Sequence, residues 1–409
     1  MSSYLSMKVG DMSWIKMVYD FDTMVDRTSL SSQKWSFVKQ RTGDPTILPM
    51  WVADMDFAVA PEIVEAIKAR AAVPSYGYTQ RTDGYYNGLI NWMKRRHGWD
   101  GVQRDWILFT PGVVAGFNFA IQAYSYPGDK VIVQPPCYYP FFDAITNNGR
   151  RLVNNPLKIV DGNYVMDYED LEQKIDGRTK MIILCSPHNP VGRVWKRGEL
   201  EKLVEVCAKK DIVIISDEIH NDLILGVTKH TPTATVSEEA MKRTVTLVAT
   251  SKTFNLAGLT NSNVIIPDRK LRNRFDNVTE NNRTRNTNIF GIIAQEAAYA
   301  KGEPWLEELL VYLRGNYRFL EDYVKDKIPL LKVYPLEGTY LAWVDCSRLD
   351  MGDEALKEFM LKKARLWFDE GTMFGVGGSM FMRINLACTR NILKEALSRL
   401  EKAVSELKL

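Results

Sequence analysis

The feature that most constrains the fold is a series of unbroken apolar, β-branched runs that alternate with segments of helical periodicity. In residues 198–209, for example, Leu200, Leu203, Val204 and Cys207 recur at helical spacing. Strands joined by helices form parallel sheets through right-handed crossovers, and strands without polar alternation are covered on both faces. We therefore expect an α/β fold with a mostly parallel sheet. Its candidate strands are residues 130–133, 180–185, 212–216, 245–249 and 263–266.

The pattern changes after about residue 300 to long helices around a few strands. These elements are expected in residues 305–324, 331–344, 353–367 and 381–387. Thr389 has the side chain of an N-cap, and the apolar residues after it recur at helical spacing. We predict a large domain in residues 55–300 and a smaller α+β domain in residues 301–409. Residues 1–54 are predicted to join the small domain.

The charge balance bears on the partners of the protein. The chain has 53 Lys and Arg against 50 Asp and Glu, a net charge of +3, and no long basic run. These values exclude the electrostatic footprint of a nucleic-acid binder and favour a small-molecule partner.

The amino terminus and the cysteines bear on the compartment. The first residues lack a basic stretch followed by an apolar segment, and no stretch approaches about 18 uninterrupted apolar residues. We expect a cytoplasmic protein without a membrane partner. Its 5 cysteines are widely spaced, without a C-x-x-C pair, and are predicted to be reduced, buried thiols. No metal site is predicted.

Two polar residues directly follow apolar strands, at the end where open α/β sheets bind their ligands. Lys252 follows residues 245–249, and a lysine in this place can form a Schiff base. Asp217 follows residues 212–216, and an aspartate against a pyridine nitrogen keeps that nitrogen protonated, so that the ring accepts electrons. Each residue alone has a commoner interpretation, as a surface lysine or as a carboxylate that caps a strand or binds a metal.

Three further features follow candidate strands. The Asn-Pro step at Asn189 can present an amide to a cofactor oxygen, and the aromatic Tyr138 can stack on a ring. The turn at Gly112 opens a helix whose free N–H groups and dipole can hold a phosphate. Ordinary turns and helix starts share each of these sequences. Because five such features occur together along one chain, they predict a pyridoxal 5'-phosphate (PLP) site.

In these motifs the chain resembles fold-type I PLP enzymes of the aspartate aminotransferase superfamily, over almost its whole length. More specific motifs are similar to those of the C-S lyase branch, the cystathionine β-lyase and cystalysin-like proteins. These are Tyr19-Asp-Phe-Asp-Thr, Ser32-Gln-Lys-Trp35, Met50-Trp-Val-Ala-Asp-Met-Asp-Phe57, Tyr76-Gly-Tyr-Thr79, Asp217-Glu-Ile-His220, Ser251-Lys-Thr-Phe-Asn255 and Phe381-Met-Arg-Ile-Asn385. The resemblance implies a three-layer αβα large domain, a smaller α+β domain, and a homodimer with composite active sites.

The resemblance also implies a role for each motif residue. Arg383 is similar to the arginine that grips the substrate α-carboxylate, and Tyr78 to a tyrosine that reaches the cofactor phosphate of the neighbouring subunit. Lys252, Tyr138 and Tyr78 are the implied catalytic residues. The implied cofactor contacts within one chain are Lys252 (covalent bond), Asp217 (pyridine nitrogen), Asn189 (3'-oxygen), Tyr138 (ring stacking) and Gly112, Val113, Val114 and Ser251 (phosphate).

Two positions depart from the aminotransferase pattern and agree with the lyase branch. His220 stands where aminotransferases usually carry a tyrosine beside the 3'-oxygen, and Thr260 stands where they usually carry a phosphate-binding arginine. Without that arginine, hydroxyl and helix N–H groups must hold the phosphate. His220 is interpreted either as a cofactor contact or as a histidine satisfied at a strand end.

The resemblance implies α,β-elimination of L-cystathionine or a related cysteine S-conjugate to pyruvate, ammonia and a thiol. Lys252 would remove the α-proton, and Lys252 or a nearby tyrosine would protonate the leaving thiolate. One alternative is an aminotransferase, which shares the first steps, and a second is a PLP-containing regulatory binding protein. The sequence leaves the preferred sulfur amino acid and the pathway open. A cis peptide is expected at the Asn189-Pro190 step.

Overall fold

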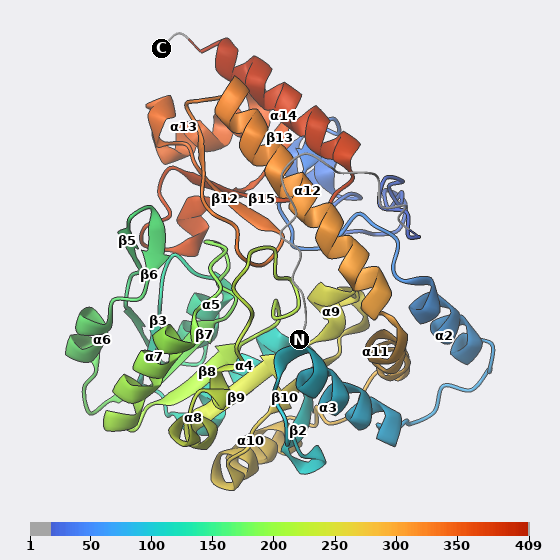
Figure 1. Cartoon of the computed structure of the whole chain (residues 1–409), viewed down its shortest axis with the longest axis vertical. Helices are drawn as coiled ribbons and strands as arrows, with labels where there is room; N and C mark the ends of the chain where they lie inside the picture. Colours follow the sequence, from blue (N-terminus) through green and yellow to red (C-terminus); the bar gives the residue numbers. More distant parts are fainter. Residues whose placement is uncertain (1–17, 408–409) are drawn as a thin grey trace, which may run out of the picture.

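The computed structural model describes residues 18–407, and its large domain is built on a seven-stranded sheet (Figure 1). Each of the five predicted strands is present, with ends shifted by one residue at most. In spatial order the strands are β2 (Ile107–Thr110), β10 (Ser262–Ile265), β9 (Thr244–Val248), β8 (Val213–Asp217), β7 (Thr179–Cys185), β3 (Lys130–Val133) and β4 (Arg151–Asn154).

The prediction of a mostly parallel sheet is confirmed, with one correction at the strand predicted from residues 263–266. Strand β10 runs antiparallel to both β9 and β2. The link from β9 to β10 contains only the four-residue helix α9 (Thr250–Thr253) and a short 3-10 turn (Ala257–Leu259). A parallel return usually runs through a full helix, which this link lacks, and β10 returns in the opposite direction.

Both faces of the sheet are covered, as the unbroken apolar runs predict. Val131 and Val133 of β3 lie in one buried cluster with residues of α4 (Val113–Tyr124), whereas Ile132 lies in another with residues of α7 (Arg197–Lys209). Successive side chains of a strand point to opposite faces, so the alternation assigns these two helices to opposite layers. Helices α5 (Pro140–Asn147) and α10 (Arg269–Asn281) join α4, while α6 (Tyr168–Lys174) and α8 (Glu238–Arg243) join α7.

The small domain, at the top of Figure 1, is an antiparallel sheet covered by long helices. Its helix α14 begins where predicted, because the Thr389 hydroxyl accepts the Ile392 N–H at the N-cap. Its strands, in spatial order, are β11 (Lys332–Val333), β12 (Leu341–Asp345), β15 (Phe381–Asn385) and β14 (Asp369–Glu370). Its helices are α12 (Glu303–Lys327), α13 (Asp353–Glu358) and α14 (Arg390–Ser405).

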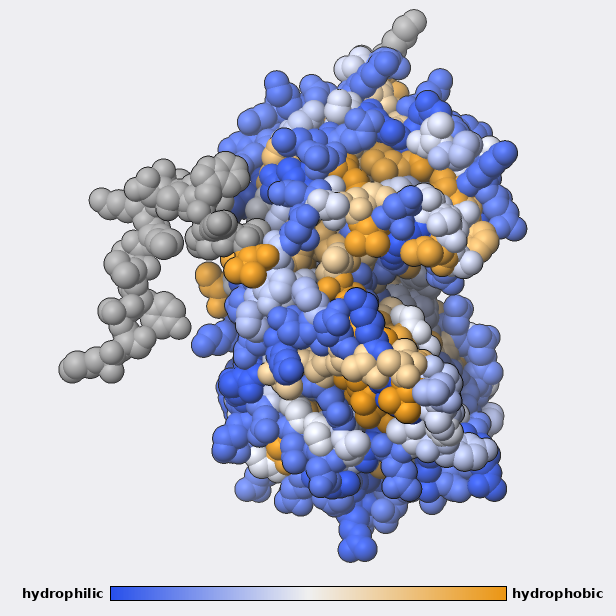
Figure 2. Space-filling model, turned by 90° about the vertical axis from the view of Figure 1, so that its right-hand side faces the viewer, coloured by the Kyte–Doolittle hydropathy of each residue, from blue (hydrophilic) through white to orange (hydrophobic). Residues whose placement is uncertain are grey.

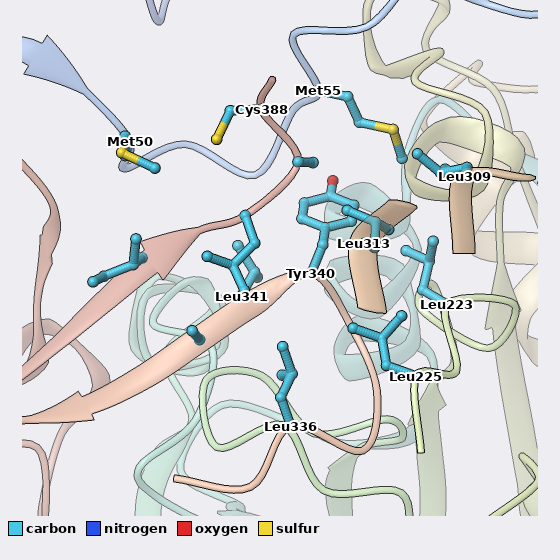
Figure 3. Packing of buried hydrophobic residues seen from close by; sticks show 14 of the residues in the cluster. Met50, Met55, Leu223, Leu225, Leu309, Leu313, Leu336, Tyr340, Leu341 and Cys388 are labelled. Atoms are coloured by element: carbon cyan, nitrogen blue, oxygen red, sulfur yellow. The ribbon is translucent and has the colours of Figure 1, made fainter. Parts of the chain in front are cut away.

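The amino-terminal segment packs on both domains. Strand β1 (Leu48–Pro49) pairs in parallel with β13 (Leu366–Trp367) of the small domain. Helices α2 (Pro61–Ala71), α3 (Asp83–His97) and α11 (Ile289–Lys301) lie together at the edge of the large domain. Figure 3 shows Met50 and Met55 in the buried cluster that also holds Leu309 of α12 and Leu223 beyond β8. The predicted domain limits, at residues 54 and 300, stay a prediction.

The surface and the cysteines agree with the composition. The face in Figure 2 is mostly hydrophilic, with apolar side chains gathered over its middle. All 5 cysteines are free and buried, as predicted. Within residues 18–407, no helix is long and apolar enough to cross a lipid bilayer.

Candidate active site

A cavity of about 300 Å³ lies where the chain leaves the carboxyl ends of β7, β8 and β9, opposite the first turn of α4. This is the sheet edge at which parallel α/β folds bind ligands. Of the residues singled out in the sequence, those that line it are Gly112, Val113, Val114, Tyr138, Asn189, Asp217, His220, Ser251, Lys252 and Thr260.

Lys252 lies in the short helix α9, directly after β9. Its Nζ donates a hydrogen bond of 2.5 Å to the main-chain oxygen of Ala53. Burial, opposed by the negative charge of Asp54 and assisted by the positive charge of Arg383, lowers the pKa of the Lys252 amine to about 8. A lysine with this pKa is neutral often enough near pH 7 to act as a nucleophile and a base.

Ala53 is a contact that the sequence could not indicate, because its role rests on a backbone oxygen. The segment around it is held from several sides. The Asn385 amide donates to the carbonyls on either side of Ala53, at 2.6 Å each. Three residues further along the chain, the Asp56 carboxylate pairs with Lys34 at 2.7 Å, and both side chains are fully buried. Lys252 therefore reaches an acceptor on a rigid segment.

Asp217 is the last residue of β8 and stands beside Cys185 of β7 and Leu247 of β9. One of its oxygens accepts the N–H of Ile219 at 3.1 Å. Burial raises the pKa of the Asp217 carboxyl to about 7. A buried carboxylate in this condition is stabilised by a cation placed against it, as a protonated ring nitrogen would be.

The first turn of α4 forms the opposite wall of the cavity. Gly112, its N-cap, has φ +143°, a conformation that favours glycine, and no described atom lies within 4 Å of a Cβ built there. The helix has no side-chain cap, so its first N–H groups remain available to an anion. Thr260, in the left-handed region at φ +46°, and Asn261 also line the cavity.

Asn189 lies in the turn after β7, and its peptide bond to Pro190 is cis, as predicted. The Asn189 side-chain oxygen accepts a hydrogen bond of 3.0 Å from Nη1 of Arg383. Tyr138 stands before helix α5 and packs edge-on against Phe141, with 5.7 Å between ring centroids. Burial raises the pKa of the Tyr138 hydroxyl, so it is protonated at neutral pH.

His220 is buried, and its ring stands edge-on to Tyr340 at 6.0 Å between centroids. Burial holds the pKa of the imidazole well below its usual range, so the ring is neutral. Its Nδ1 has no hydrogen-bond partner among the described residues. Tyr340, labelled in Figure 3, donates to the Ala53 oxygen at 3.0 Å, and sequence reasoning missed it.

The loop that presents Asp217 and His220 is anchored through Glu218 and Asp222, two buried carboxylates that sequence reasoning also missed. Each accepts several hydrogen bonds of 2.8 to 3.0 Å, and these bonds fix the position of the loop. The partners are Ser216, Thr233 and His230 for Glu218, and Trp92, Arg96, His97 and Thr253 for Asp222.

Two predicted residues lie outside the cavity lining. Arg383 of β15 is buried and reaches the site through its contact with Asn189. Tyr78 is fully exposed, in a stretch without helix or strand between α2 and α3. The described chain therefore does not bring Tyr78 to its own cavity, and its predicted contact with a partner subunit stays a prediction.

These residues fit PLP. The cofactor carries an aldehyde, a basic ring nitrogen and a phosphate. The buried Lys252 amine matches the aldehyde, the buried Asp217 carboxyl matches the ring nitrogen, and the uncapped turn at Gly112 matches the phosphate.

Comparisons with known proteins give the same result. The family model described as aminotransferase class I and II matches residues 46–400. Cystathionine beta-lyase PatB of Bacillus subtilis is 42% identical over 387 residues, 94% of this chain and 100% of PatB. Cystalysin from Treponema denticola, whose structure contains PLP, is 40% identical with a TM-score of 0.93, over 96% of this chain and 100% of cystalysin.

A PLP-bound C-S lyase from Staphylococcus hominis is 32% identical with a TM-score of 0.88, over 96% of this chain and 99% of the lyase. The family model, the full-length similarities and the fitted cavity agree on one assignment. The chain belongs to the aminotransferase class I and II family, and it is a fold-type I, PLP-dependent enzyme of the C-S lyase branch.

Proposed function

We propose that this enzyme cleaves the Cβ–S bond of L-cystathionine or a related cysteine S-conjugate by α,β-elimination. Overall, the conjugate and one water give a thiol, pyruvate and ammonia. The observation that carries the proposal is a buried lysine amine, with its pKa lowered to about 8, in a chain with full-length similarity to C-S lyases.

Each residue of the site has its own role in the proposed reaction. When bound, PLP withdraws electrons from the substrate α-carbon and so makes its proton removable. Asp217 holds the ring nitrogen in its cationic form, and the turn at Gly112 holds the phosphate. Arg383 orients the α-carboxylate. The Lys252 amine takes the α-proton, and Lys252 or the protonated Tyr138 hydroxyl gives a proton to the leaving thiolate.

An aminotransferase activity is the second candidate, because the family model also covers aminotransferases and every residue up to α-proton removal serves both reactions. The two differ in where the proton goes next. In elimination Lys252 would pass the proton to the leaving thiolate, whereas in transamination it would return the proton and no C–S bond would break.

The test is to incubate the purified enzyme separately with L-cystathionine, L-cystine and L-cysteine. Pyruvate and ammonia should appear in equal amounts without any added keto acid. In parallel, amino transfer to an added keto acid is measured. Amino transfer without pyruvate release would identify an aminotransferase. The absence of both reactions with the PLP-loaded protein would favour a regulatory binding protein.

We further propose that the enzyme is a homodimer in which Tyr78 completes the site of the partner. Its full exposure, on a segment outside any helix or strand, suits a residue that reaches across an interface. Two-fold dimers are the commonest homo-oligomers, and such an axis gives both sites the same exchanged contact.

This arrangement predicts complementation between two inactive variants. Mixing Tyr78→Ala with Lys252→Ala, under conditions that let subunits exchange, should restore up to about a quarter of wild-type pyruvate release. Random exchange makes about half the dimers hybrids, and each hybrid has one site without either lesion. Sedimentation measures dimer formation. If hybrids form but remain inactive, Tyr78 acts within its own chain.

A further inference from the structure

Arg383 is surrounded by acceptors from three parts of the chain. Its Nη1 donates to Asn189 Oδ1 at 3.0 Å, and its Nη2 donates to the Trp51 carbonyl at 2.9 Å. The same Nη2 forms an ion pair with the Asp369 carboxylate. The guanidinium lies 4.9 Å from the ring centroid of Phe374. Its Nε has no hydrogen-bond partner in the described part of the chain.

The pairing of Asp369 with Arg383 is built into the small-domain sheet. The two residues stand directly opposite each other in the antiparallel pair β14 and β15, so their side chains lie on the same face. Both side chains are about 3% exposed. Burial raises the pKa of the Asp369 carboxyl, and Arg383 opposes that rise. The neighbouring acid Glu370 faces away and pairs with Lys357 at 3.0 Å.

Asp369 binds an N–H donor of Arg383 that a bidentate substrate carboxylate requires. A guanidinium presents parallel N–H bonds along two edges, Nε with Nη2 and Nη1 with Nη2. Both edges use an Nη2 hydrogen. Nη2 has two hydrogens, and Trp51 and Asp369 take both. A bidentate carboxylate therefore binds only after one of these acceptors moves away.

Of the two acceptors, the Asp369 carboxylate is held by fewer contacts than the Trp51 carbonyl. The Trp51 carbonyl belongs to a fixed backbone, because the residue before it bonds to Trp367 and to Asn385, at 2.8 and 2.9 Å. The Trp51 ring is also stacked on Trp367, with centroids 4.7 Å apart. Among the described residues the Asp369 carboxylate has no hydrogen-bond partner other than Arg383, so its release of Nη2 breaks no second hydrogen bond. The unpartnered Nε is a further donor for the incoming carboxylate.

We propose that Asp369 is a displaceable counter-ion of Arg383, which competes with the substrate α-carboxylate and so limits its affinity. This inference rests on the proposed role of Arg383. The same competition acts on the product pyruvate, which is also a carboxylate, and favours its release. Asp369 is thus a residue that sets affinity through Arg383, without itself contacting the reacting atoms.

The test measures binding of propionate, a carboxylate without an amino group, to the PLP-loaded enzyme by calorimetry. Asp369→Asn keeps the size of the side chain but removes its charge. We expect the dissociation constant for propionate to fall about tenfold, as for a coupling of one charged pair. The KM for L-cystathionine should fall as well, with a smaller change in kcat. A residue with a purely structural role would give weaker binding when replaced.

Glu370→Gln is the matched control. It also removes one negative charge, at the next residue in the chain, but the Glu370 side chain pairs with Lys357 and does not contact Arg383. It should bind propionate like the wild type. Unchanged or weaker binding by Asp369→Asn overturns the proposal. If that variant does not fold, as judged from thermal unfolding and cofactor absorption, Asp369→Ala is measured in its place with the same expectation.

Arg383→Lys separates this inference from the proposed function. This variant should lose most propionate binding, because a point charge does not match both carboxylate oxygens. If Arg383→Lys loses propionate binding and Asp369→Asn binds propionate no more tightly than the wild type, only the counter-ion proposal fails. If Arg383→Lys binds propionate like the wild type, the proposed role of Arg383 fails and the counter-ion proposal fails with it. Neither outcome depends on lyase turnover.

Discussion

Replacement of Lys252 by alanine is expected to lower pyruvate release from L-cystathionine by a factor on the order of 10⁴ or more. The reason is that, in the proposed mechanism, one amine serves as the covalent anchor of the cofactor and as the base for the α-proton. The other titratable groups of the described cavity lining are Tyr138, Asp217, His220 and Cys185. Burial raises the pKa of the Tyr138 and Cys185 side chains and lowers that of His220, so none of the three is an effective base at neutral pH. Asp217 is assigned to the ring nitrogen, so the cavity offers no substitute for Lys252.

The measurement pairs a pyruvate assay with chemical mapping. Borohydride reduction of the wild type should fix the cofactor permanently on the peptide that contains Lys252, and the variant should show no fixed cofactor. Lys301→Ala, at an exposed position at the end of α11, is the control and should behave like the wild type in both assays. A reduced cofactor found on another lysine would contradict the assignment of Lys252.

Replacement of Asp217 by asparagine is expected to lower activity by a factor on the order of 10³, with PLP still bound. Asparagine has nearly the same shape but carries no charge, so it does not hold the ring nitrogen in its cationic form. Pyruvate release with saturating L-cystathionine and PLP measures the effect. Activity within tenfold of the wild type would exclude Asp217 as the partner of the ring nitrogen.

Removal of the cofactor gives a second test of Asp217, through the pH dependence of stability. In the cofactor-free protein its pKa is about 7, above the usual value of 3.8. Between these values the folded protein binds more protons than the unfolded chain, so the free energy of unfolding falls as pH rises from about 4 to about 7. The loss from this group is on the order of a few kcal/mol.

Urea unfolding of the cofactor-free wild type and of Asp217→Asn, at about pH 5 and about pH 8, measures this contribution. The wild type should lose more stability than the variant over this interval, since asparagine does not titrate. Equal losses in the two proteins would mean that the pKa of the Asp217 carboxyl is not raised in the folded protein. Lys252 has a pKa of about 8 in the folded protein, against a usual value of 10.5. Its effect on the free energy of unfolding therefore changes mainly between about pH 8 and about pH 10.5, and it does not reverse the loss expected between about pH 5 and about pH 8.

Much of the fold and most of the site could be predicted from the sequence, because the relevant signals are local. The apolar runs at β3, β7, β8 and β9 specify strands covered on both faces, whatever their partners are. A polar residue directly after such a strand lies at the ligand-binding edge of a parallel sheet. Lys252, Asp217 and Asn189 therefore converge on one cavity.

Other features depend on contacts between distant parts of the chain. The direction of β10 could not be predicted from the sequence, because periodicity shows that a run is a strand but does not show which way it pairs. The Ala53 oxygen that accepts from Lys252 is a backbone atom, and any residue type supplies one. Glu218 and Asp222 have the same sequence signature as exposed acids, and only their partners from α3 and the loops make them anchors.

The sequence by itself determined the layered α/β architecture, the cofactor and the residues at the strand ends, since each follows from the chemistry of a short segment. The tertiary structure alone decided how these groups are tuned. Burial sets the pKa of Lys252 near 8 and that of Asp217 near 7, and cross-strand register places Asp369 against Arg383. Burial and register are properties of the packed chain, because they arise from segments that meet only after folding.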